Sequence, residues 1–234
     1  MTLHVDLYLW RLDPEAATLA RRAAHLSEDE AARAARFVRP RDGNAYRAGR
    51  GRLREILGEL TGVAPSNLRF DYGPEGKPAL PGGPLFNLSH TGPYACLAVS
   101  ADTQLGLDIE QEREIEDDVA RRFFSPTEYA ALSALPVTGW RAGFYRCWTR
   151  KEALVKALGG GLSIPLDAFD VTLDAAGPPR LTRLDPAYGT AADWALLHLR
   201  AAPGVPGALA LRSMGRTVTT RVREGGLSVG HSSP

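Results

Sequence analysis

The sequence predicts an α+β protein made of two halves. Segments with the period of two that is typical of strands, and segments with helical spacing, occur in similar proportion over residues 1–100 and again over 105–222. The 234 residues, 44% of them hydrophobic, can form one large domain or two small ones with a substantial core. We expect an amino-terminal half at 1–103, a carboxy-terminal half at 104–223 and a flexible Gly/Ser-rich tail at 224–234.

The composition gives no reason to expect nucleic acid or a membrane as partner. The chain has 28 basic and 27 acidic residues, so its net charge is +1. The first ten residues alternate like a strand, unlike a signal peptide, and no apolar run has the length of a transmembrane helix. Cys96 and Cys147 lie in apolar runs without a C-x-x-C pair, which favours buried free thiols over a zinc site or a disulfide. We therefore expect a cytoplasmic protein.

In the amino-terminal half, a strand at 1–10 is followed by three helices. Asp13-Pro14-Glu15 is a helix start, in which a cap precedes proline at the first helical position. Ser27 and Glu30 form a capping box for the second helix, and Asp42 is expected to cap the third. The third helix carries several arginines on one face. Two interpretations remain: these arginines form a solvated helix face, or they bind phosphate.

Three further strands complete this half, at 68–72, 85–89 and 94–100. A turn-rich loop, Gly73 to Pro78, separates the first two of these strands and carries a lysine near its tip.

The carboxy-terminal half begins with Leu105-Gly106-Leu107-Asp108-Ile109-Glu110. Apolar residues alternate with the rest, so the segment predicts a half-buried strand with an apolar inner face. Asp108 and Glu110 share the other face, about 6.5 Å apart. Two such carboxylates repel each other unless a cation lies between them, and Mg²⁺ with phosphate oxygens is one solution. A solvated strand edge is the alternative.

The rest of this half alternates helices with strands. A helix is expected to end at about Phe123, a second to begin at the capping box Ser125-Pro126-Thr127-Glu128, and a long third to cover 139–158 before Gly159-Gly160-Gly161 stops it. Strands are expected at 169–173, 194–199, 208–212 and 218–222.

The long helix contains a second pair of charges. Glu152 and Lys156 are four residues apart and so share one helix face. On a solvated surface they would form an ordinary ion pair. The flanking Trp148, Leu154 and Val155 indicate a deeply packed helix, and near two further carboxylates such a pair would suit catalysis.

Five motifs in one order together resemble a known family, the 4′-phosphopantetheinyl transferase superfamily, in particular its surfactin-synthetase-activating type. They are Gly76-Lys77-Pro78, Phe86-Asn87-Leu88-Ser89-His90-Thr91, the strand 105–110, Arg122-Phe123-Phe124-Ser125-Pro126-Thr127-Glu128-Tyr129 and Trp148-Thr149-Arg150-Lys151-Glu152-Ala153-Leu154-Val155-Lys156. The resemblance is clear from about residue 73 to 173 and fades in the last sixty residues.

The resemblance implies an enzyme that moves the phosphopantetheine arm of coenzyme A onto a serine of an apo acyl or peptidyl carrier protein. The reaction would depend on Mg²⁺ and release adenosine 3′,5′-bisphosphate. It also implies a monomer of two similar α+β halves, each a small antiparallel sheet with a packed helix. Coenzyme A would lie in the cleft between them, with the adenosine side on 1–103 and the Mg²⁺ site on 104–223.

The resemblance also implies roles for individual residues. Asp108, Glu110 and Glu152 would hold Mg²⁺, with Glu152 as a third ligand, the general base or both. Lys156 would neutralise phosphate charge and His90 would contact phosphate, which makes Glu152, Lys156 and His90 the catalytic candidates. The remaining candidates to bind coenzyme A are Gly76, Lys77, Pro78, Ser89, Arg47 and Arg50.

The sequence departs from the family at two positions. Members often have basic residues for the ribose 3′-phosphate where Glu30 and Ala45 stand here, so Arg33, Arg47 or Arg50 would have to substitute. Glu128 is matched, but its place in a helix cap is a sufficient structural role. Two other functions remain open: a Mg²⁺-dependent phosphohydrolase acting on coenzyme A or nucleotides, and a non-catalytic coenzyme A-binding module.

Overall fold

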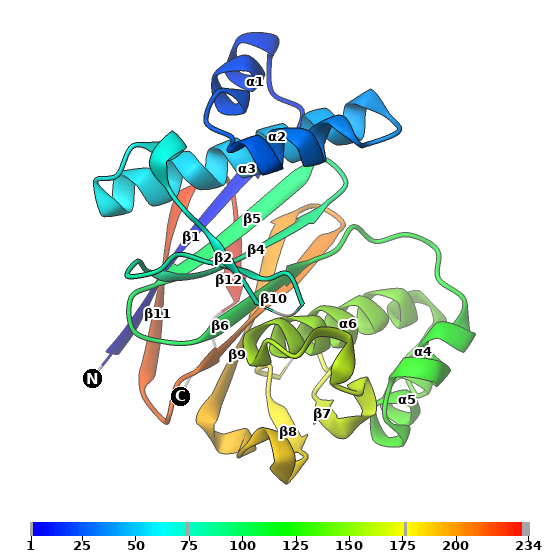
Figure 1. Ribbon diagram of the computed structural model, residues 1–234. Helices are drawn as coiled ribbons and strands as arrows, with labels where there is room; N and C mark the ends of the chain where they lie inside the picture. The colour runs from blue at the N-terminus through cyan, green and yellow to red at the C-terminus, as the bar shows by residue number, and fades with distance from the viewer. Residues whose placement is uncertain (1, 74, 176, 231–234) are drawn as a thin grey trace.

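The computed structural model describes residues 2–73, 75–175 and 177–230 and shows a mixed α+β fold with two four-stranded sheets (Figure 1). Met1, Pro74 and residues 231–234, where the sequence predicts the first strand, the turn-rich loop and the tail respectively, lie outside the described residues. The helices are α1 (Ala16–Ala23), α2 (Glu28–Ala35), α3 (Pro40–Thr61), α4 (Asp117–Phe123), α5 (Pro126–Ser133) and α6 (Val137–Leu158).

The first sheet has the order β11-β1-β5-β4 and the second the order β12-β9-β10-β6. The first sheet consists of β1 (Thr2–Arg11), β4 (Leu85–Thr91), β5 (Tyr94–Ser100) and β11 (Thr217–Glu224). The second consists of β6 (Leu105–Ile109), β9 (Trp194–Ala202), β10 (Val205–Arg212) and β12 (Ser228–Gly230). Two short hairpins complete the fold: β2 (Asp71–Tyr72) with β3 (Pro78–Ala79), and β7 (Phe169–Val171) with β8 (Leu181–Leu184).

The two halves share strands at their edges. β11, which belongs to the carboxy-terminal half except for its last residue, pairs in parallel with β1 and so joins the sheet of the first half (Figure 1). Part of the stretch expected to form a flexible tail is also a strand, because β12 pairs with β9. The remaining pairings within both sheets are antiparallel.

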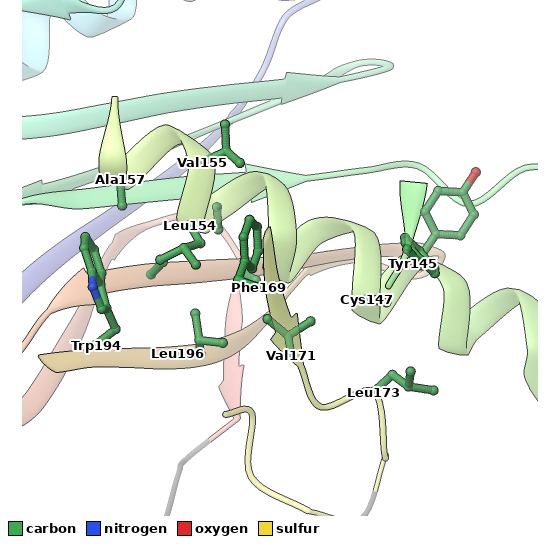
Figure 2. Close-up of a cluster of buried hydrophobic side chains, with 14 of the residues drawn as sticks. Tyr145, Cys147, Leu154, Val155, Ala157, Phe169, Val171, Leu173, Trp194 and Leu196 are labelled. Atoms are coloured by element: carbon green, nitrogen blue, oxygen red, sulfur yellow. The ribbon is translucent and has the colours of Figure 1, made fainter. Parts of the chain in front are cut away.

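Three apolar clusters arrange the fold in layers. One lies between α3 and the first sheet, one between the two sheets, and one between the second sheet and α6. β1 shows how the pleat divides its residues, since Leu7 faces the second sheet while Tyr8 faces α3. Figure 2 shows the third cluster, in which Leu154 of α6 packs with Phe169 and Leu196. α6 is therefore fixed on the face of the second sheet that points away from the first.

The elements expected from local patterns are present, with several corrections at their ends. The third helix begins at Pro40, so Asp42 lies in its first turn and does not cap it. The first begins at Ala16, and Asp13 pairs with Arg11 instead of capping it. Only the last two residues of 68–72 are strand. The strand 105–110 was expected to be half-buried, but all five residues of β6 are buried because α6 covers its second face.

Candidate active site

Asp108, Lys156 and Ser89 meet where the two sheets and α6 come together. The Lys156 ammonium donates to Asp108 Oδ1 at 2.6 Å and to Ser89 Oγ at 3.2 Å. Ser89 donates to the same Asp108 oxygen at 3.1 Å. The Asp108 side chain is 5% exposed and that of Lys156 is 29% exposed. The carboxylate is thus buried, while the ammonium extends toward solvent.

Glu110 and Glu152 lie close to this group. Glu110 accepts a hydrogen bond of 3.0 Å from Thr91 Oγ1. Burial raises the pKa of Asp108 to about 6 against the opposing effect of the Lys156 ammonium, and the negative charges of Glu110 and Glu152 raise it further. Burial, and then the charge of Glu110, likewise keeps the pKa of Glu152 above its ordinary value. Asp108 and Glu110 therefore share one electrostatic environment with Glu152, which comes from a distant segment.

The donor set suits a hard divalent cation. Asp108 Oδ2 is buried without a hydrogen-bond partner among the residues that the structure describes, and a buried oxygen of this kind calls for a partner. Oxygen donors are those that Mg²⁺ prefers. Within residues 2–73, 75–175 and 177–230, however, no three Asp, Glu, His or Cys side chains are already gathered at metal-binding spacing. The metal ligands expected from the sequence stay a prediction.

A cavity of about 640 Å³ reaches from the amino-terminal helices to the last turn of α6. Residues expected to bind coenzyme A line it: Arg50, Gly76, Lys77, Pro78, His90 and Lys156. Ser89 does not line it, because its hydroxyl is turned toward Asp108. Burial and then the charge of Lys156 lower the pKa of the His90 imidazole, which favours the neutral ring.

Lys77 makes contacts that the sequence did not suggest. Its ammonium donates to the backbone oxygen of Leu105 at 3.0 Å and to that of Lys156 at 2.6 Å. Burial lowers the pKa of Lys77 to about 8. The Lys156 carbonyl lies in the last turn of α6, where helix carbonyls lack partners within the helix and a positive charge is favourable. Lys77 thus joins the β2–β3 hairpin to the end of α6.

The arginine candidates for the 3′-phosphate differ in their surroundings. Arg50 is buried, with its guanidinium bonded to Glu30 and to the hydroxyl of Tyr72. Glu30 also bonds Arg54 at 2.7 Å, so two guanidinium groups share one buried carboxylate. Arg47 bonds Asn44 one turn earlier and does not line the cavity. Arg33 lines the cavity and stacks 5.4 Å from the ring centroid of Tyr46.

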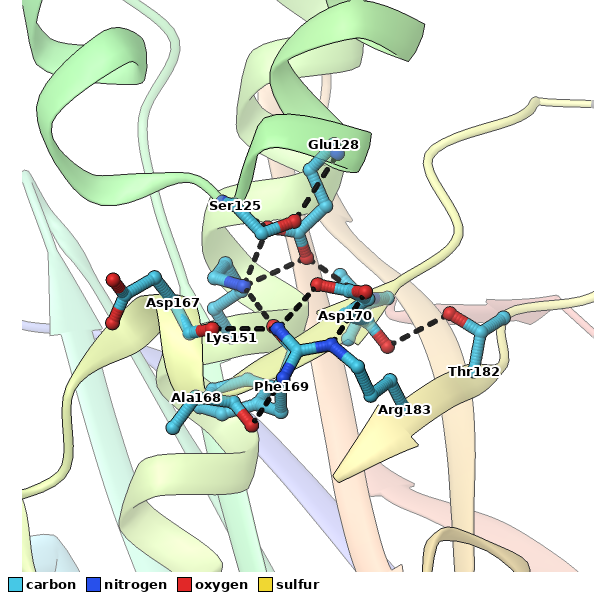
Figure 3. A network of polar contacts seen from close by, with 10 residues as sticks. Ser125, Glu128, Lys151, Asp167, Ala168, Phe169, Asp170, Thr182 and Arg183 are labelled. Carbon is cyan, nitrogen blue, oxygen red and sulfur yellow. Dashed lines mark hydrogen bonds and ion pairs between the residues drawn. The ribbon is translucent and has the colours of Figure 1, made fainter. Parts of the chain in front are cut away.

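A second charged network lies behind α6 and has a structural role (Figure 3). Glu128 and Lys151 are fully buried and 2.6 Å apart. Glu128 also accepts from the backbone N–H groups of Ser125 and Val171, at 2.9 and 2.8 Å, while Lys151 donates to the Phe169 carbonyl at 2.8 Å. The capping box predicted from the sequence is confirmed. The network ties α5 and β7 to α6 on the face away from Asp108.

Three residues that shape this site had no role assigned from the sequence. Asn87 and Thr91 bond β6 from the neighbouring strand, and Gly106 underlies α6. A polar residue at every second position of the motif 86–91 was the available signal for the first two. None of the helices in the described part of the chain combines the length and the apolar character needed to cross a bilayer.

Both halves of the chain match family models that describe 4′-phosphopantetheinyl transferases. A family described as the 4′-phosphopantetheinyl transferase superfamily matches residues 104–208, and one described as 4′-phosphopantetheinyl transferase, N-terminal, matches residues 10–102. The chain is 41% identical over 203 residues to the 4′-phosphopantetheinyl transferase HetI of Nostoc sp., covering 83% of this chain and 82% of the relative.

Two further matches are more distant. The 4′-phosphopantetheinyl transferase Sfp of Bacillus subtilis is 34% identical over 154 residues, or 65% of this chain and 68% of the relative. The solved holo-[acyl-carrier-protein] synthase of Thermotoga maritima matches with a TM-score of 0.37 and 20% identity, covering 46% of this chain and 61% of that one.

Proposed function

Because the chain belongs to the 4′-phosphopantetheinyl transferase superfamily, we propose that it transfers the 4′-phosphopantetheine arm of coenzyme A to a serine of an apo acyl or peptidyl carrier protein. The observation that carries this proposal is the Lys156 ammonium, which lines a cavity of about 640 Å³ and bonds Asp108 at 2.6 Å, with Glu152 near enough to raise the pKa of Asp108. The cavity offers cationic and glycine-rich walls to a diphosphate ligand, and the carboxylates offer a base and a cation site.

The proposed reaction is a displacement at phosphorus. The carrier serine oxygen bonds to the phosphorus nearer the pantetheine, and the bond from that phosphorus to the bridging oxygen breaks. Adenosine 3′,5′-bisphosphate leaves with the bond electrons, and the serine proton passes to a base. Glu152 suits this role, because burial raises its pKa toward the working pH.

The charges of the site would act on the diphosphate. Lys156, at the wall of the cavity, would neutralise charge that develops on the leaving phosphate. His90 would donate from its neutral imidazole. Asp108, Glu110 and Glu152 would hold Mg²⁺, which when bound would offset the negative charge of both phosphates. Without a cation, three carboxylates would repel such a substrate.

The other end of the cavity would take the adenosine side of coenzyme A. Arg33 lines the cavity there and offers a cation without the buried carboxylate that engages Arg50, while Gly76, Lys77 and Pro78 form a wall that Lys77 ties to the last turn of α6. Residues 1–103 would thus supply the nucleotide side and 104–223 the Mg²⁺ site and the catalytic helix. We propose that the enzyme works as a monomer in the cytoplasm, where its two buried free thiols stay reduced.

The test is incubation with coenzyme A, Mg²⁺ and a panel of apo carrier proteins, followed by mass spectrometry. One serine of a carrier should gain a phosphopantetheine group, and adenosine 3′,5′-bisphosphate should appear in equal amount. Glu152→Ala should lower the rate at least 100-fold, whereas Glu112→Ala, which removes an acid outside the site, should not. Transfer to no carrier under any divalent metal, with phosphate released from coenzyme A alone, would instead identify a phosphohydrolase.

A further inference from the structure

The two sheets meet at β4 and β6, and side chains take the place of backbone pairing between them. Both are edge strands of their sheets. Asn87 Oδ1 accepts from the Leu107 N–H at 2.7 Å, Ser89 Oγ from the Ile109 N–H at 3.3 Å, and Thr91 Oγ1 from the Gln111 N–H at 3.0 Å. Every second residue of β4 thus bonds every second N–H along β6 and just beyond it. We call Asn87, Ser89 and Thr91 the polar ladder.

The polar ladder meets a requirement of the buried edge. The intervening N–H of Glu110 faces the other way and bonds the Pro206 carbonyl, as expected for β6 paired with β10. The N–H groups of Leu107 and Ile109 point away from β10 and belong to fully buried residues. Unpaired, each would carry a desolvation cost. A side-chain acceptor satisfies them and also holds the two strands further apart than the roughly 4.8 Å of direct pairing.

Two members of the polar ladder also bond the carboxylates of the site. The Ser89 hydroxyl donates its one proton to Asp108 Oδ1. It accepts hydrogen bonds from the Ile109 N–H and the Lys156 ammonium, so both of its lone pairs are used as well. Thr91 donates to Glu110 Oε2 at 3.0 Å while it accepts from Gln111. Each hydroxyl is therefore fixed by the β6 backbone on one side and directed at a carboxylate on the other.

From these contacts we propose that Asn87, Ser89 and Thr91 are positioning residues, which hold the edge of β6 and orient Asp108 and Glu110 toward the cation site. This inference rests on the proposed function in one respect, which is that the cation is Mg²⁺. It gives Ser89 a role inside the protein in place of a contact to coenzyme A. It also accounts for the spacing of the motif Phe86–Thr91, in which alternate side chains reach β6.

Thr91 offers the cleanest test, because Thr91→Val removes the hydroxyl and keeps the shape. Mg²⁺ affinity is measured on the free chain, by titration calorimetry without coenzyme A or carrier. Thr91→Val should weaken Mg²⁺ binding about tenfold, as loss of a group that orients a metal ligand does, and Thr91→Ser should restore it to within about twofold. Thr61→Val, which removes a hydroxyl bonded to the Leu57 carbonyl at the end of α3, should bind Mg²⁺ as the unaltered protein does.

Amide hydrogen exchange supplies a second reading that needs no metal. The Gln111 amide should exchange faster in Thr91→Val than in Thr91→Ser, and the Leu107 amide should be affected only by Asn87→Leu. The proposal is overturned if Thr91→Val binds Mg²⁺ normally, if Thr91→Ser fails as Thr91→Val does, or if the unaltered chain binds no Mg²⁺. The carrier-protein assay decides the transferase function separately, since neither measurement here involves transfer.

Discussion

Gly106 on β6 lies directly beneath the backbone of Ala153 on α6, with no room for a methyl group between them. A Cβ at Gly106 would overlap the Ala153 carbonyl oxygen and the Ala157 nitrogen. The helix therefore rests on the strand at the closest distance the backbone permits. Lys156 reaches Asp108 across this contact, so the ion pair at the site depends on the missing side chain.

Gly106→Ala should separate α6 from β6 and disrupt the site. We expect a loss of about 1–3 kcal/mol in unfolding free energy from overpacking, and a fall in transferase rate of at least 100-fold. Urea unfolding and the carrier assay measure the two effects. Gly226→Ala, at a glycine with no atoms near the added carbon, is the matched control. Unchanged activity in Gly106→Ala would show that the helix can move without cost.

The buried pair behind α6 should dominate the stability of the carboxy-terminal half. Lys151→Met leaves the Glu128 carboxylate buried without its cation, and the expected cost is about 3–5 kcal/mol in urea unfolding. Adding Glu128→Gln removes the stranded charge and should recover part of the loss. Arg183→Met breaks a more exposed pair with Asp170 nearby and should cost at most about 1 kcal/mol. Equal losses of unfolding free energy in Lys151→Met and Arg183→Met would contradict the expected difference between the buried and the exposed ion pair.

Lys77 should hold the β2–β3 hairpin on α6 in the free protein. Lysine occurs only three times among the 28 basic residues, and each of the three bonds a buried or half-buried acceptor. In Lys77→Met, hydrogen exchange should accelerate in the hairpin and in the last turn of α6 before any ligand is added. Arg69→Met removes an exposed charge from the preceding segment and should have no such effect. A lysine that only bound phosphate would leave exchange in the free chain unchanged.

His198 should make the protein less stable in mild acid. Burial, followed by the charges of Arg150 and Arg146, lowers the pKa of this imidazole to about 4. Between pH 6.5 and about 4 the unfolded chain binds a proton that the folded chain does not, so the unfolding free energy falls as the pH is lowered. With allowance for solvent, we expect unaltered protein to lose about 1–2 kcal/mol more than His198→Gln between pH 7.5 and 4.5. His4→Gln, which replaces an exposed imidazole on β1, should behave as the unaltered protein.

Local patterns in the sequence predicted the elements that carry the candidate catalytic residues. β5 has the expected bounds of residues 94–100, and α6 ends where the glycines stop it, with Gly159 in the left-handed conformation. Alternation and capping depend on near neighbours, so one sequence is enough to recognise them. The alternation also predicted correctly which face of β6 is apolar. It could not predict the burial of Asp108, because the helix that packs over this residue lies almost fifty residues later in the chain.

The contacts that define the site depend on segments far apart in the chain. Nothing local reveals that Lys77 bonds two backbone carbonyls, or that Glu30 captures Arg50. Six of the residues that the family resemblance implied for coenzyme A binding line the cavity. The resemblance could not separate Arg33 from Arg47, since both are arginines near the same helices. Their difference arises from the packing of α2 against α3, which the sequence does not specify locally.

The parallel pairing of β11 with β1 bears on how the chain matures during synthesis. Residues 2–8 acquire their outer neighbour only after residue 224 has been made. Until then the first sheet has an open side with unpaired backbone groups, which invites association with other chains. The first half cannot finish folding as it leaves the ribosome, and removal of the last twenty residues should cause aggregation instead of yielding a smaller working enzyme.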